Sequence, residues 1–154
     1  MTAIARPAAF ADEPPAPDRR SGYEFMSRET RAMQDDDTAN PGLLWVLEGA
    51  ALWTRKTGAA RRACADCHGD ARASMNGVAA RHPAFDAAQG RPLALEQRIN
   101  RCRTDRQQAP AIAWESRELL ALTAYVARQS RGQPIEAARD PRAQPFLDAG
   151  RHEP

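Results

Sequence analysis

Three closely spaced residues, Cys64, Cys67 and His68, form the sequence C-x-x-C-H. On a helical turn, positions i, i+3 and i+4 share one face, so both thiols can reach the two vinyl groups of a single porphyrin. The same turn carries the His68 imidazole beneath the ring, where it can bind iron. This motif is typical of haem c attachment. It predicts one covalent haem c held by Cys64 and Cys67, with His68 as the proximal iron ligand.

Two other chemistries share part of this motif. A redox dithiol uses C-x-x-C but normally follows a strand, and no strand is predicted before Cys64. A zinc site could combine the motif with Cys102, although tetrahedral coordination by the adjacent Cys67 and His68 would be strained. A zinc-binding interaction module is therefore an alternative, and haem is the favoured interpretation.

Cys102 is the candidate for the second axial position, because it lies on the apolar face of a predicted helix well beyond the motif. Arg98 and Arg106 lie four residues on either side, where they could favour a thiolate or pair with haem propionates. A thiolate ligand would lower the reduction potential. From spacing alone, an iron ligand and a buried structural cysteine are both compatible with Cys102. The less suitable candidates lie too near the motif, before it, in a predicted loop or near the end of the chain: Met75, Met26, Met33, His82 and His152.

Helices are the only elements that the sequence predicts around these residues. Asn40-Pro41 is a strong helix start, and Gly58 suits the cap at its end. A second helix is expected to open at Pro92 and to end near Gln107, and Ser116 caps a third that Gly132 and Pro134 stop. Their apolar faces are Leu43, Val46, Leu47, Ala50 and Trp53, then Leu95, Ile99 and Cys102, then Leu119, Leu122, Tyr125 and Val126.

These helices predict an all-α domain of the class I cytochrome c type at residues 21–135, with irregular tails at 1–20 and 136–154. Gly49–Trp53 and Leu122–Tyr125 are expected to form the crossing helix pair of that fold. Residues 27–36 suggest one further short helix, and residues 70–91 are predicted to be mostly loop. No strand is predicted.

Composition narrows the function. The chain has 154 residues and a formal net charge of +2, its acidic and basic residues are interspersed, and no nucleic-acid signature is present. No segment has the roughly 18 apolar residues of a membrane span. Ala9-Phe10-Ala11 resembles a signal-peptidase site, so residues 1–11 could be the remnant of an export signal whose true start lies upstream.

One long segment resembles a known family. The stretch from Gly22 that reads GYEFMSRETRAMQDDDTANPGLLWVLEGAALW, followed by CADCHGD, is similar to SoxA, the larger subunit of the SoxAX cytochrome of bacterial sulfur oxidation. The later stretches INRCRT, VARQSRGQPI and DPRAQPFLDAGR extend the resemblance to Arg151.

The resemblance implies a periplasmic protein with a role in thiosulfate oxidation. SoxA proteins attach thiosulfate to a cysteine of the SoxYZ carrier, as L-cysteine S-thiosulfotransferases, and pass electrons to a SoxX monohaem cytochrome and a soluble cytochrome acceptor. By position, the N-terminal haem would be linked to Cys64 and Cys67 and ligated by His68 and Cys102.

The resemblance also sets a limit on the expected activity. Family members continue into a second domain with another C-x-x-C-H and the cysteine at which sulfur chemistry occurs, whereas this sequence ends at Pro154. We expect it to correspond to the N-terminal haem domain of a truncated or split protein, with residues 136–154 as a tail or the start of a linker. Whether it is an enzyme is therefore left open. A complete thiosulfate-binding enzyme that uses Cys102 is the alternative.

Overall fold

The computed structural model describes residues 21–135 and 140–152, the last two by their backbone. The chain forms two compact units, one ending at Asn40 and one beginning at Pro41. The predicted tail at 1–20, with its possible export remnant, lies outside the described residues.

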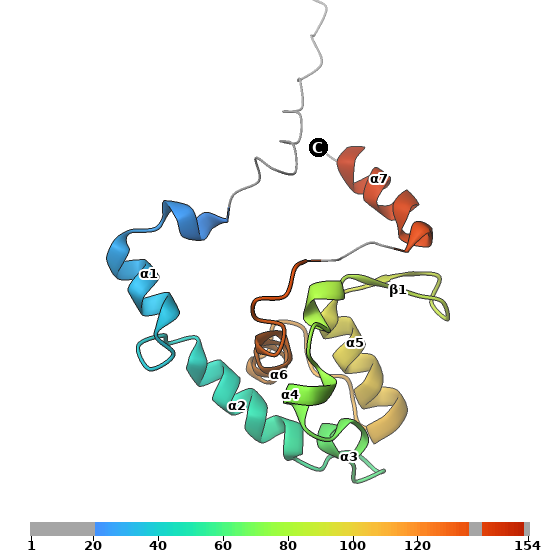
Figure 1. Ribbon diagram of the computed structural model, residues 1–154. Coiled ribbons are helices and arrows are strands. Elements are labelled where there is room, and N and C mark those ends of the chain that lie inside the picture. The colour runs from blue at the N-terminus through green and yellow to red at the C-terminus, as the bar shows by residue number, and fades with distance from the viewer. Residues whose placement is uncertain (1–20, 136–139, 153–154) are drawn as a thin grey trace, which may run out of the picture. The chain divides into compact units, whose positions relative to one another are not determined.

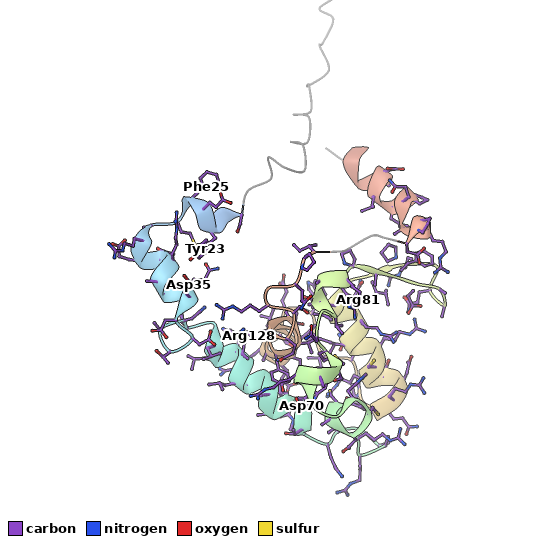
Figure 2. All side chains as sticks on the ribbon, viewed as in Figure 1. Tyr23, Phe25, Asp35, Asp70, Arg81 and Arg128 are labelled. Atoms are coloured by element: carbon purple, nitrogen blue, oxygen red, sulfur yellow. The ribbon has the colours of Figure 1, made fainter. Side chains whose placement is uncertain are left out.

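The first unit contains a 3-10 turn, η2 (Gly22–Phe25), and the helix α1 (Arg28–Asp35). Ser27 caps α1 because its hydroxyl accepts the Thr30 backbone N–H at 3.2 Å. The Tyr23 hydroxyl donates to Asp35 at 2.5 Å and thereby ties the turn to the end of the helix (Figure 2). The predicted short helix is confirmed.

The second unit is mainly helical, which confirms the predicted all-α class (Figure 1). Short helical and 3-10 turns lie between its longer helices. Its elements are α2 (Leu43–Thr54), α3 (Cys64–His68), α4 (Ala71–Ser74), η3 (Ala79–Arg81), β1 (Ala84–Asp86), β2 (Arg91–Leu93), α5 (Leu95–Cys102), η4 (Arg103–Gln107), α6 (Arg117–Arg128), η5 (Pro141–Ala143) and α7 (Gln144–His152).

The prediction that the domain contains no strand is wrong. β1 and β2 pair as a small antiparallel hairpin in which Phe85 lies opposite Pro92. Pro92 therefore belongs to a strand and does not open α5. That helix begins after Ala94, whose backbone N–H donates to the Gln97 side chain at 2.9 Å.

Both predicted ends of α2 also differ. The helix begins at Leu43 after Gly42, so Asn40 is not its N-cap and Pro41 is not its first residue. It ends at Thr54, and Gly58 lies four residues later in a turn with φ +68°. The predicted C-terminal tail includes η5 and α7. Asp140 caps η5 by accepting the Arg142 backbone N–H at 3.0 Å.

Gly49 allows α2 and α6 to cross at very short range. A Cβ at this position would lie 2.1 Å from the Ala121 carbonyl oxygen and 2.5 Å from the Tyr125 Cβ. Nearby, the Trp53 and Tyr125 rings are 5.8 Å apart between centroids. The predicted crossing pair is therefore confirmed, and only glycine fits at its centre.

Two small groups of buried side chains form the core of the second unit. One consists of Trp53, Ala71, Leu95 and Val126, and the other of Ile112, Leu119 and Leu122. Ile99 of α5 packs against both groups. Among the helices of residues 21–135 and 140–152, none combines the length and the apolar character that crossing a bilayer requires.

Candidate haem-binding site

A cavity of about 350 Å³ lies among α2, α3, α5 and α6. Its volume falls within the range of about 300–1,000 Å³ that is usual for ligand and cofactor sites. All six residues that the sequence selected line it: Cys64, Cys67, His68, Arg98, Cys102 and Arg106. Much of the remaining wall is apolar and comes from Leu52, Trp53, Leu95, Ile99, Ile112, Leu122 and Val126. The cavity is largely apolar, as a porphyrin requires. Its lining also includes two thiols that could form the covalent links, and an imidazole and a third thiol that could bind the iron.

The motif adopts the single helical turn that covalent attachment requires. The Asp66 carboxylate accepts the Ala63 backbone N–H at 2.8 Å, which fixes the start of α3. The Gly69 N–H donates to the Ala65 carbonyl at 2.8 Å, and Gly69 has φ +66°. The turn therefore ends directly after His68.

Trp53 connects this turn to the core. Its indole N–H donates to the Gly69 carbonyl at 3.0 Å, and its ring centroid lies 5.7 Å from that of His68. The Trp53 side chain is only 5% exposed. A rigid, buried ring thus positions both the end of α3 and the histidine of the motif.

Cys102 is the last residue of α5, where the helix changes its hydrogen-bond pattern. The next five residues form η4, a single π-helical turn, and such turns often mark functional sites. Asn100 holds this end of α5 in place. Its side chain donates to the Ile112 carbonyl at 2.9 Å and accepts the Ile112 N–H at 2.7 Å.

Gln107 brings the two cysteine-bearing segments together. It is 7% exposed, and its side-chain amide donates to the Cys64 sulfur at 3.6 Å. Burial raises the pKa of the Cys64 thiol; the Gln107 hydrogen bond opposes that shift, and Cys102 adds to it. Cys64 and Cys102 therefore share one electrostatic environment.

The arginines near Cys102 differ in their partners. Arg98 lines the cavity and also pairs with Asp86 of β1 at 3.5 Å. Asp86 holds Arg101 as well, at 2.5 Å. Arg103 and Arg106 line the cavity, and Arg103 donates to the Pro110 carbonyl at 2.7 Å.

Desolvation acts to raise the pKa of Asp86. Hydrogen bonds from the Gln89 backbone and from Arg101 outweigh it, so the pKa of this carboxyl lies below its ordinary value. Asp86 thereby holds the hairpin against α5, the helix that carries Cys102.

Two disfavoured candidates, Met75 and His82, also line the cavity. The His82 Nδ1 lies 2.9 Å from the Val78 carbonyl oxygen, so one ring nitrogen already has a partner. Within residues 21–135 and 140–152, no three His, Cys, Asp or Glu side chains group as ligands for an isolated ion. The zinc-binding alternative is not favoured.

Three residues of the site were not predicted from the sequence: Trp53 as a hydrogen-bond donor, Gln107 and Asp86. Trp53 was recognised only as a core residue of α2. Gln107 lies in a polar stretch, RTDRQQ, and nothing in that stretch distinguishes it as buried. The sequence places Arg103 directly after Cys102, within the positive field expected there, and Arg103 lines the cavity.

Comparisons with known proteins agree with this geometry. The family model described as "SoxA/TsdA, cytochrome c domain" matches residues 48–135. The chain is 37% identical over 151 residues to the L-cysteine S-thiosulfotransferase subunit SoxA of Rhodovulum sulfidophilum. This match covers 98% of the chain and 52% of the relative. It is 38% identical over 129 residues to the SoxA subunit of Pseudaminobacter salicylatoxidans, in a match that covers 84% of the chain and 45% of that relative.

A solved structure is similar as well. The crystal structure of SoxXA from P. pantotrophus matches with a TM-score of 0.79 and 29% identity, over 85% of this chain and 49% of that one. This match confirms the predicted class I cytochrome c-like fold. The chain spans about half the length of the relatives it matches.

Proposed function

The chain belongs to the SoxA/TsdA cytochrome c domain family, and from this premise we propose that it is a monohaem electron-transfer domain that serves thiosulfate oxidation. Membership implies that it carries covalently bound haem c. The observation that supports the proposal most is that the C-x-x-C-H turn and Cys102 line one largely apolar cavity. In this proposal Cys64 and Cys67 hold the haem by thioether bonds, and His68 and Cys102 are its axial ligands.

The chain's own residues would set the properties of the bound group. Haem supplies reversible one-electron transfer, and a thiolate ligand stabilises its ferric state. The apolar walls would shield much of the bound group from water, and Trp53 would help to orient the His68 ring through their contact. Gln107 holds the Cys64 sulfur, and Arg103 and Arg106, which line the cavity, would be available to pair with the haem propionates.

The wider role concerns the whole protein in which such a domain works. The relatives are named as L-cysteine S-thiosulfotransferase subunits, and the matched structure is titled SoxXA. We propose by analogy a periplasmic location and three partners: a SoxX-like monohaem cytochrome, the SoxYZ carrier and a soluble cytochrome acceptor. The alternative of a complete enzyme that uses Cys102 is not favoured, because Cys102 lines the same cavity as the C-x-x-C-H turn and would serve there as an iron ligand.

Spectroscopy of protein matured with a haem-lyase system tests the haem assignment. We expect a pyridine haemochrome spectrum of haem c and haem that stays bound on denaturation, both of which Cys64→Ala/Cys67→Ala should abolish. Cys102→Ser should change the ferric spectrum and raise the midpoint potential. His82→Ala is the matched control, because His82 lines the same cavity, and it should leave both unchanged. The ligand assignment is refuted if His82→Ala changes the ferric spectrum and the midpoint potential while Cys102→Ser leaves both unchanged.

Reduction by the proposed pathway tests the wider role. Thiosulfate and SoxYZ should reduce the haem of this chain only when a SoxX-like partner and the second, sulfur-reacting domain of a SoxA protein are both present. If the haem is attached but no combination of these components reduces or oxidises it, the electron-transfer role in thiosulfate oxidation is wrong.

A further inference from the structure

Several positive side chains lie at the edge of the cavity. Four of them line it, and the neighbouring loop at 55–62 contributes three more. We call this set the basic rim: Arg55, Lys56, Arg61, Arg62, Arg98, Arg103 and Arg106. The rim holds seven positive side chains, and among the residues that line the cavity Glu118 is the one carboxylate, whereas the whole chain has a formal net charge of only +2.

Backbone contacts hold the loop at the cavity edge. The Ala59 and Ala60 N–H groups donate to the carbonyls of Gln108 and Gln107, at 3.1 and 3.2 Å. Thr57 of the loop lines the cavity itself. Lys56, Arg61 and Arg62 are exposed, so their charges face solvent beside the site.

Most of the rim is not neutralised. Arg55 pairs with Glu118 at 2.6 Å and Arg98 with Asp86 at 3.5 Å. The other five side chains have no carboxylate within 4 Å among the described residues: Lys56, Arg61, Arg62, Arg103 and Arg106. Two haem propionates would offset two of these charges and leave the rim positive.

Cys67 and His68 are exposed at this cavity, so the redox centre proposed above would be reached through positively charged surroundings. Clefts lined by one sign of charge attract partners of the opposite sign and accelerate encounter by about 10- to 1,000-fold at low salt. We propose that the basic rim is the docking surface for an acidic face of a redox protein that exchanges electrons with this domain. This inference rests on the proposed electron-transfer function.

Two small oxidants of opposite charge test the rim directly. Dithionite-reduced holoprotein is mixed with [Fe(EDTA)]⁻ or with [Ru(NH₃)₆]³⁺, each of which takes one electron from ferrous haem. Raising the NaCl concentration from about 10 mM to about 0.5 M shortens the Debye length from about 30 Å to a few ångströms. We expect the rate with the anionic complex to fall about tenfold or more, and the rate with the cationic complex to rise.

Charge-reversing variants locate the effect. Lys56→Glu/Arg62→Glu changes exposed rim residues that do not line the cavity, and it should remove most of the salt dependence with [Fe(EDTA)]⁻. Arg91→Glu/Arg142→Glu is the control with the same change in net charge. Arg91 lies in β2 and Arg142 in η5, which contacts the hairpin, and Figure 1 places the hairpin at the other end of the unit from α3.

A binding measurement provides a readout without electron transfer. Poly-L-glutamate, titrated calorimetrically into the holoprotein, should bind the wild type and the control at least tenfold more tightly than the rim variant. The proposed docking surface is wrong if poly-L-glutamate binds the rim and control variants equally tightly. It is also wrong if the rate with [Fe(EDTA)]⁻ depends equally on salt in the two variants. If neither oxidant reacts with the reduced haem, the proposed electron-transfer function fails instead, so the two failures are distinguishable.

Discussion

Replacing Gly49 with alanine tests the helix crossing that positions the site. The added methyl carbon would lie 2.1 Å from a backbone oxygen of Ala121 and 2.5 Å from the Cβ of Tyr125. Both atoms belong to α6, so no flexible side chain can move aside. To restore normal contacts, the two helices must separate by about 1 Å, and close-packed interiors resist such a shift.

The magnitude follows from two opposing effects. Alanine is the better helix former by about 1 kcal/mol, whereas overpacking of a core costs about 1–3 kcal/mol and occasionally more. Contact with backbone at this distance lies at the severe end, so we expect a net loss of about 1–3 kcal/mol in the free energy of unfolding. For a unit of this size, that corresponds to a decrease in Tm of roughly 3–15 °C.

Thermal unfolding of the holoprotein, followed by far-UV circular dichroism and the Soret band, provides the assay. Gly150→Ala in α7 is the matched control, because a Cβ there would meet no atom within 4 Å, and it should leave the Tm unchanged or slightly higher. A Gly49→Ala protein as stable as the wild type would refute the close approach of α2 and α6.

Three further outcomes follow from the site. Trp53→Phe keeps an aromatic ring but loses the hydrogen bond to the Gly69 carbonyl, which should cost about 1 kcal/mol in urea unfolding. The pKa of Asp86 is lowered in the folded state, so its carboxylate stabilises the fold above its ordinary pKa, and that contribution disappears as pH falls through the lowered value. Asp86→Asn should therefore reduce the Tm at pH 7, and the difference from wild type should shrink below about pH 4; a difference independent of pH would contradict this. In apoprotein, iodoacetamide should modify the exposed Cys67 before Cys64, whose thiol has a raised pKa, and peptide mass spectrometry would show the order.

The helices were predictable from sequence where strong local signals lie beside an apolar period. Ser116 caps α6 through the Leu119 N–H at 3.4 Å, as its position suggested. The hairpin was not predictable, because three-residue strands are too short to display an alternating pattern. A proline in one of them also resembles a helix start more than a strand.

The C-terminal elements were missed although a signal was present. Asp140-Pro141 is the type of start that was expected at Asn40-Pro41, whereas residues 136–154 are predicted to be a tail. The site shows the opposite limit. C-x-x-C-H identifies its own residues, whereas Gln107 and Asp86 act through partners that are distant in sequence, and no local pattern encodes such pairs.

The loop at 55–62, which contains Gly58, should tolerate added residues less well than the hairpin turn, which contains Gly90. Gly58 has φ +68°, and a Cβ there would lie 2.0 Å from the Gln107 carbonyl oxygen, so its loop fits directly onto the turn after Cys102. Gly90 also has positive φ, but a Cβ there would meet nothing within 4 Å. Insertions are therefore expected to accumulate in the hairpin turn and to be excluded at 55–62, because a longer loop there would move the motif and the Cys102 turn out of register.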